Sequence, residues 1–199
     1  MEIRRRGRTI TIEGKVLNSL DKQVVSFTKM LGFRYAIVSG YVALLFGRTR
    51  ATEDIDVLIE SLDRKAFSAF YEKLAGNRYY IINADNENDA FAFLNEGIPL
   101  RITRVGTIIP NFEVKTPKDE IGRLTLDKRM SVKMGKYKVA ISPIELQIAF
   151  KLYLGSEKDY LDARHLFGLL KEDINMRELR RFIRLLRVKE SIAKKILGV

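Results

Sequence analysis

The sequence has no cysteine and a single histidine, His165. Without cysteine the chain forms neither disulfides nor thiolate metal sites. One histidine cannot build an imidazole metal site or a convincing Ser–His–acid triad, so we expect His165 to pack between its apolar neighbours. These absences exclude disulfides and thiolate metal sites, and they argue against an imidazole metal site or a Ser–His–acid triad.

Long apolar runs and targeting signals are also absent. No run approaches the roughly 18 apolar residues of a transmembrane helix. The first six residues, MEIRRR, lack the apolar centre of a signal peptide. There is no Gly-rich Walker loop and no dinucleotide fingerprint. We therefore expect a cytoplasmic protein with no membrane partner.

Positive charge is in excess. The 199 residues include 36 Lys and Arg against 25 Asp and Glu, a formal net charge of +11. This excess favours polyanionic partners such as RNA, DNA or nucleotides. The alternative is a solvated surface of the kind found in thermophiles, which fits the charged fraction and the missing Cys. The apolar fraction of 46% indicates a globular protein with one good core, or a domain with a helical annex.

Residues 35–60 form the stretch around which the chain is organised. The β-branched run 35–38 predicts a strand that ends at the tight turn Ser39-Gly40. An apolar helical turn or two follows over 41–46, and then a polar loop. The alternating residues 54–59 predict a second strand.

The residue types in this stretch suit phosphate and metal binding. A helix that starts after Gly40 directs backbone N–H groups at the turn, and glycine lets a phosphate approach the main chain. Asp54 and Asp56 lie two residues apart on one strand, so they share a face at about 7 Å spacing. A divalent cation is the simplest compensation for two neighbouring carboxylates, and hard cations prefer oxygen ligands.

Ser39-Gly40-Tyr41 followed by Asp54-x-Asp56 resembles the signature of the DNA-polymerase-β-like nucleotidyltransferase superfamily. Tyr41 departs from that signature, because a second Gly or Ser is usual there. The resemblance implies that Asp54 and Asp56 are catalytic and hold Mg²⁺, or alternatively Mn²⁺.

The same resemblance assigns residues to the nucleotide. The run Arg50-x-Thr52-x-Asp54 is typical of small prokaryotic members. The Ser39-Gly40 turn would hold the triphosphate, with Arg50 and Thr52 shaping the loop that faces it. The remaining reading is an exposed acidic strand end beside a structural glycine turn.

A third acidic residue is expected in this superfamily on the strand after the Asp-x-Asp unit, and it is not evident here. Thr103 stands in the predicted strand where an acid is expected, and a hydroxyl supplies no base. Glu113 is the alternative if the following strand provides the acid. Asp85 and Asp89 are weaker candidates. Without a third acid, the protein would be a degenerate version that binds nucleotide and metal but transfers slowly or not at all.

The flanking patterns predict a mixed α/β (α+β) sheet with helices. Residues 1–12 are either a short strand or a mobile basic arm. The other expected elements are helices over 14–31, 64–74 and 89–94, strands over 78–82 and 100–105, a short helix from 116, and a hairpin over 129–141. We expect a nucleotidyltransferase-like domain over 1–141 and a C-terminal helical domain over 142–199.

The helical segment begins with a predicted capping box, in which Ser142 caps, Pro143 takes the first position and Glu145 closes the box. Helices to about 154 and over 157–170 follow, and the tail reads as two more. The pattern from Lys151 to Leu166, which includes Asp159 and Asp162, resembles the helical half of abortive-infection (AbiEii-like) toxins. That resemblance implies that Lys151 faces the cleft toward the triphosphate and that Asp159 also belongs to the nucleotide site.

The tail also carries arginines on one side of a predicted helix, which could hold an RNA backbone or simply face solvent. They are Arg177, Arg180, Arg181, Arg184 and Arg187.

Two functions from different classes remain. The first is a metal-dependent nucleotidyltransferase that moves a nucleoside monophosphate from an NTP to a hydroxyl of RNA, such as tRNA, or of protein. It could act as a toxin component with an antitoxin partner. The second is a catalytically degenerate protein that binds nucleotide or nucleic acid through its basic surface. A lower alternative is a helical, antitoxin-like partner protein.

Overall fold

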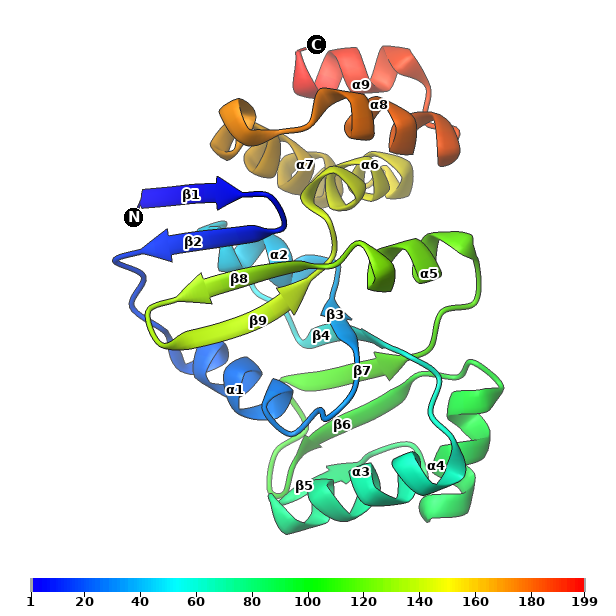
Figure 1. Ribbon diagram of the computed structural model, residues 1–199. Coiled ribbons are helices and arrows are strands. Elements are labelled where there is room, and N and C mark those ends of the chain that lie inside the picture. The colour runs from blue at the N-terminus through cyan, green and yellow to red at the C-terminus, as the bar shows by residue number, and fades with distance from the viewer. Residues whose placement is uncertain (1, 199) are drawn as a thin grey trace.

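The computed structural model describes residues 2–198, which form one large mixed sheet flanked by helices (Figure 1). Within these residues the sheet has nine strands in the order β1-β2-β8-β9-β3-β4-β7-β6-β5. The strands are β1 (Glu2–Arg6), β2 (Thr9–Glu13), β3 (Tyr35–Ile37), β4 (Asp54–Ile59), β5 (Tyr79–Ile81), β6 (Leu100–Arg104), β7 (Asn111–Lys115), β8 (Met130–Met134) and β9 (Tyr137–Ile141). The predicted fold class is confirmed.

The helices lie on both sides of the sheet and at one end of it (Figure 1). They are α1 (Ser19–Thr28), α2 (Gly40–Leu45), α3 (Arg64–Gly76), α4 (Glu87–Asn95), α5 (Glu120–Asp127), α6 (Ile144–Leu154), α7 (Glu157–Leu169), α8 (Met176–Leu185) and α9 (Glu190–Leu197). No helix within residues 2–198 combines the length and the apolar character needed to cross a bilayer.

Strand β7 lies between β4 and β6 in the sheet, although both of them precede it in the sequence. It runs parallel to β4, with Asp56 opposite Glu113, and antiparallel to β6, with Arg101 opposite Glu113. The strand that neighbours the Asp-x-Asp strand is therefore β7. This order decides which acidic side chain lies next to Asp56.

Alternation along the central strands separates an apolar face from a polar one. Ile55 and Val57 of β4 belong to the main core, where Phe112 of β7 stacks on Phe27 of α1 with ring centroids 3.8 Å apart. On the other face, Leu126 of α5 packs on Leu58. Helix α5 thus covers one end of this face and leaves the residues at the start of β4 uncovered.

The N-terminal residues form a hairpin that extends the sheet, which is the strand alternative of the two considered. Strand β2 pairs in parallel with β8. From β1, Arg5 Nη1 donates to Glu145 Oε1 at 2.5 Å. Glu145 also accepts from the backbone N of Asn175 at 2.9 Å. One buried carboxylate therefore connects the hairpin, α6 and the start of α8.

Three predicted helix starts are wrong in detail. Helix α1 begins at Ser19 and not at residue 14, because Asn18 and Asp21 form a capping box there. The box expected at Ser142 does not form, since Pro143 is the N-cap of α6 without a side-chain hydrogen bond, and Glu145 is engaged with Arg5. Helix α5 starts at Glu120, capped by the residue before it, and not at 116.

The C-terminal helices α6 to α9 stack at one end of the sheet (Figure 1). Most side chains of α6 are buried, because α6 packs against α7 and α8 and its first residues join the main core. One hydrophobic cluster contains Ile141 and Ile144 as well as Leu179 of α8. The partition at residues 141 and 142 stays a prediction, and the core is continuous across it.

We predict that Glu145→Gln destabilises the fold by about 1.5–3 kcal/mol, because a charged hydrogen bond to Arg5 is lost in a buried position. Urea unfolding followed by circular dichroism measures the change. Glu2→Gln is the matched control, since the Glu2–Arg4 pair is exposed and solvent screens its charges, so its loss should change stability far less. Equal stability of the two variants would contradict the assignment.

Candidate functional site

The Ser39–Gly40 turn joins β3 to α2 and is held by the helical segment. Ser39 has φ 61° and ψ −132°, a conformation that residues with a Cβ rarely adopt. Its N–H donates to Gln147 Oε1 at 3.2 Å, and its carbonyl accepts from Gln147 Nε2 at 2.7 Å. Ser142 Oγ donates to the same Oε1 at 2.9 Å. The shape of the turn therefore depends on α6.

Tyr41, the departure from the family signature, does not obstruct the turn. Its side chain is buried, and its hydroxyl donates to Asp21 Oδ1 at 2.8 Å. Burial, with the nearby Asp21 charge, raises the pKa of the Tyr41 hydroxyl well above its usual range. The Tyr41 hydroxyl thus binds a residue of α1, and only Ser39 and Gly40 remain at the turn.

Arg50 lies against the backbone of the turn. A Cβ built on Gly40 would lie 2.4 Å from Arg50 Nη2, so a larger residue at position 40 would displace this guanidinium. Helix α2 is only six residues long, which limits its dipole. The positive charge at the turn comes mainly from Arg50.

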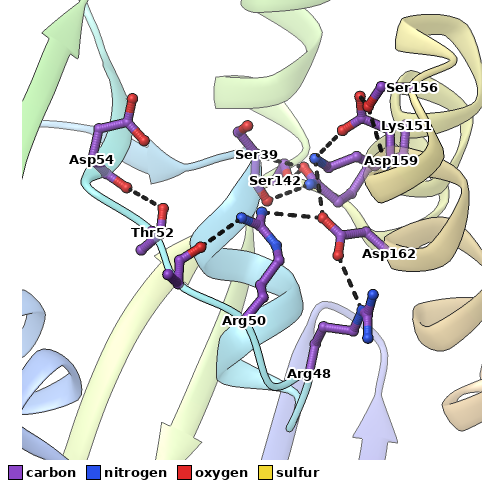
Figure 2. A network of polar contacts seen from close by, with 12 residues as sticks. Ser39, Arg48, Arg50, Thr52, Asp54, Ser142, Lys151, Ser156, Asp159 and Asp162 are labelled. Carbon is purple, nitrogen blue, oxygen red and sulfur yellow. Dashed lines mark hydrogen bonds and ion pairs between the residues drawn. The ribbon is translucent and has the colours of Figure 1, made fainter.

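A fully buried carboxylate, Asp162 of α7, holds Arg50 in this place (Figure 2). Its oxygens lie 3.2 Å from Arg50 Nη2, 3.4 Å from Arg48 Nε and 3.2 Å from Lys151 Nζ. The Nε atoms of both arginines are buried and donate no hydrogen bond within residues 2–198. Three cations from a loop and from α6 thus converge on one acid.

Lys151 and Asp159 are brought together behind Arg50. Lys151 is 2% exposed, and its ammonium lies 2.6 Å from Asp159 Oδ1 (Figure 2). Burial by itself would raise the pKa of Asp159, but hydrogen bonds from Lys151 and Ser156 outweigh it and hold the pKa below its usual range. Lys151 was expected to face the triphosphate; in this arrangement its ammonium is enclosed between two carboxylates.

Asp54 and Asp56 lie on the polar face of β4, beside this cluster. Thr52 Oγ1 donates to the backbone carbonyl of Asp54 at 2.9 Å, which ties the loop to the start of the strand. Within residues 2–198 the carboxylate of Asp54 forms no side-chain hydrogen bond or ion pair. Its oxygens are therefore available to a ligand.

Glu113 of β7 is the third carboxylate of this face. It lies directly opposite Asp56 across the parallel β4–β7 pair, at the strand spacing of about 4.8 Å. Burial raises the pKa of Glu113, and the negative charges of Asp56 and Asp54 raise it further. Three acids from two adjacent strands thus share one surface.

Thr103 cannot take this role. Its side chain is fully buried, with Oγ1 donating to the carbonyl of Pro110 at 3.1 Å. It lies on β6, which is separated from β4 by β7. Asp85 and Asp89 follow β5, three strands away from β4. Of the acids considered from the sequence, Glu113 alone neighbours Asp56.

The donor chemistry of the three acids fits a hard divalent cation, because each offers carboxylate oxygens. Their placement is not a closed ligand shell: within residues 2–198, no three His, Cys, Asp or Glu side chains gather at metal-binding distance. One reason is visible, since Lys115 Nζ lies 2.5 Å from Asp56 Oδ1. The face thus has ligands of the right type, one of them paired with a lysine.

Several residues at the site were not identified from the sequence as site residues. Gln147, Asp162 and Lys115 act across long sequence distances, and only Asp162 fell within a recognised pattern. His165 lies on α7 with Nε2 3.0 Å from the carbonyl of Phe46 at the end of α2.

Comparison with known proteins bears on the fold. No known family model and no curated protein matches the sequence. Among solved structures, the chain is similar to an antigenic nucleotidyltransferase-like protein from Paracoccidioides brasiliensis. The TM-score is 0.51 and the identity 16%, over 87% of this chain and 88% of that one. This likeness shows that the chain has a nucleotidyltransferase-like fold.

A second similar structure is a tRNA nucleotidyltransferase in complex with a primer tRNA and an incoming ATP analog. The identity is again 16%, with a TM-score of 0.34 over 88% of this chain. The chain spans 58% of that protein.

We predict that Asp159→Asn lowers the free energy of unfolding at neutral pH by about 1.5–3 kcal/mol, because a buried charged contact with Lys151 is lost. The folded-state pKa of Asp159 is depressed. Its contribution is therefore present above the unfolded value of about 3.9 and is lost as pH falls through the folded pKa.

Urea unfolding between pH 7 and pH 3 measures the difference in the free energy of unfolding between the parent and Asp159→Asn. This difference should become smaller at the acidic end. The exposed Asp85, substituted by Asn, serves as the control and should give a small and constant difference. A constant difference for Asp159→Asn would show that the ion pair does not stabilise the fold.

Proposed function

We propose that the protein is a nucleotidyltransferase that moves a nucleoside monophosphate from an NTP to an acceptor hydroxyl. One observation carries the proposal: Asp54, Asp56 and Glu113 share a sheet face beside a glycine turn covered by Arg50. Carboxylates that can hold a divalent cation, next to donors for a polyphosphate, are the two parts that nucleotidyl transfer requires. The nucleotidyltransferase-like fold agrees with this proposal.

In the proposed reaction, the acceptor oxygen attacks the α-phosphorus in line. The P–O bond to the β-phosphate breaks, and pyrophosphate leaves. Asp54, Asp56 and Glu113 would hold Mg²⁺ or Mn²⁺, which when bound neutralises developing charge and favours ionisation of the acceptor hydroxyl. Glu113 would accept the hydroxyl proton, because it is the carboxylate of β7 that lies opposite Asp56.

The triphosphate would bind at the Ser39–Gly40 turn. Arg50 offers a planar donor fork that matches phosphate oxygens, and its Nη2 lies over Gly40. Asp162 and Lys151 would act through Arg50, by fixing the guanidinium from behind. Thr52 would keep the loop in register with Asp54.

For the acceptor we propose an RNA end. The exposed arginines of α8 and the turn after it favour a phosphate backbone, and their spacing places several of them on one side of the helix. The formal net charge of +11 also favours a polyanionic acceptor such as RNA. A protein hydroxyl is the alternative acceptor.

The second candidate function is a nucleic-acid-binding protein that has lost catalysis. The observation that favours it is the Lys115–Asp56 ion pair, together with the lack of a three-ligand cluster within residues 2–198. Such a protein would bind RNA in a salt-sensitive manner, and substitution of Asp54 would leave that binding unchanged.

We predict that the protein transfers label to RNA or protein from at least one α-³²P NTP in the presence of Mg²⁺, and that Asp54→Asn reduces the transfer to background. Matched γ-³²P NTPs are the control, because nucleotidyl transfer retains the α-phosphate and releases the γ-phosphate. Label from the γ-position would indicate phosphoryl transfer. No transfer, with RNA binding unchanged in Asp54→Asn, would favour the binding protein.

We predict that Glu113→Gln lowers kcat by about 10²–10⁴-fold, the range for loss of a general base. Thr103→Val serves as the control, because Thr103 is buried away from the reacting groups, and we expect kcat within about threefold of the parent after correction for folded fraction. Thermal melts establish that fraction. If kcat fell in Thr103→Val but not in Glu113→Gln, the third catalytic position would instead lie on β6.

A further inference from the structure

Lys115 is the residue whose position the proposed chemistry leaves unexplained. It ends β7, on the same face as Glu113 and two residues from it, and lies opposite Leu58 of β4. Its side chain reaches back along the sheet, so that Nζ is 2.5 Å from Asp56 Oδ1. The Lys115 ammonium thus contacts one carboxylate oxygen of Asp56, which is one of the proposed metal ligands.

The surroundings of this ion pair separate it from an ordinary surface contact. The Asp56 side chain is 16% exposed and that of Lys115 is 32% exposed, so solvent screens the pair only in part. Both residues line a cavity of about 430 Å³ between α5 and α6, which also reaches Ser39. Lys115 therefore lines a cavity that borders the proposed reaction site at Asp56 and Ser39.

The charge balance of the face explains why a cation is needed there. Asp54, Asp56 and Glu113 place three carboxylates on adjacent strands, and Arg101 flanks Glu113 from the other side. Like charges this close disfavour one another unless a cation compensates them. Lys115 supplies a compact positive charge with three donors, but it has no lone pair to share and cannot act as a ligand when protonated.

We propose that Lys115 is the built-in counter-ion of Asp56, and that a divalent cation reaches the Asp54–Asp56–Glu113 face only by displacing its ammonium. The inference rests on the proposed metal site and concerns the regulation of that site. Metal binding would then release the ammonium into the cavity between α5 and α6, where an anionic group of the substrate is its next partner. Binding of the metal and exposure of the Lys115 ammonium to the substrate would therefore occur together.

Removal of the lysine charge should therefore tighten metal binding in the absence of nucleotide. Mn²⁺ binding to the full chain is measured by electron paramagnetic resonance of the unbound ion. For Lys115→Met we expect about 10-fold to 100-fold tighter binding than for the parent, the effect of removing one competing charged contact. Lys115→Arg keeps the charge and should bind Mn²⁺ as weakly as the parent.

Lys118→Met is the matched control, because Lys118 lines the same cavity and forms no ion pair within residues 2–198. It makes the same charge change and should stay within about threefold of the parent, because an exposed charge beyond the contact is screened by salt. Asp54→Asn in the Lys115→Met background should weaken binding again, which places the Mn²⁺ on the acidic face. Thermal melts without metal confirm that each variant folds.

The outcomes separate this inference from the proposed function. Equal Mn²⁺ affinity of the parent, Lys115→Met and Lys118→Met, with loss in Asp54→Asn, overturns the role of Lys115 and leaves the metal site intact. Equal tightening by both Met variants also overturns it, since net charge would then be the cause. No Mn²⁺ binding by any variant overturns the metal site itself, and with it this inference.

Discussion

The candidate site depends on one buried charge. Asp162 has no exposed surface and is surrounded by Arg48, Arg50 and Lys151. A buried carboxylate is costly unless it is paired, so this acid requires cations from both the polar loop and α6. The requirement works in both directions: Asp162 fixes Arg50 over Gly40, and Arg50 fixes α7 against the loop that precedes β4. The Ser39–Gly40 turn and the helical segment are therefore a single structural unit.

A second constraint is the order of strands. In the chain, β5 and β6 follow the Asp-x-Asp strand β4, but in the sheet β7 lies between β4 and β6. Glu113 is thereby brought beside Asp56, while Thr103 is covered by the loop that leads to Pro110. Glu113 is an acidic neighbour of Asp56, and it lies one strand later in the sequence than Thr103, where an acid was expected. Topology, more than residue identity at one position, supplies the third carboxylate.

Local patterns predicted local structure well, and long-range contacts poorly. The strand–turn–helix–strand from β3 to β4 was predicted almost to the residue, because apolar alternation and a glycine turn are local signals. The capping box at Ser142 failed because Gln147 and Arg5 recruit its two members. Gln147, Lys115 and the enclosure of Lys151 could not be predicted, since each depends on a partner that only the folded sheet brings close.

The parallel pairing of β2 with β8 has a consequence for how the chain is made. Thr9 lies beside Ser131, roughly 120 residues further along. At the usual pace of a ribosome, about 5–20 residues per second, the first hairpin emerges several seconds before its permanent neighbour exists. During that interval its unpaired edge is open to other strands, and the arginines of β1 keep it charged and soluble. The arginines of β1 thus disfavour the pairing of β2 with other strands until β8 has been synthesised.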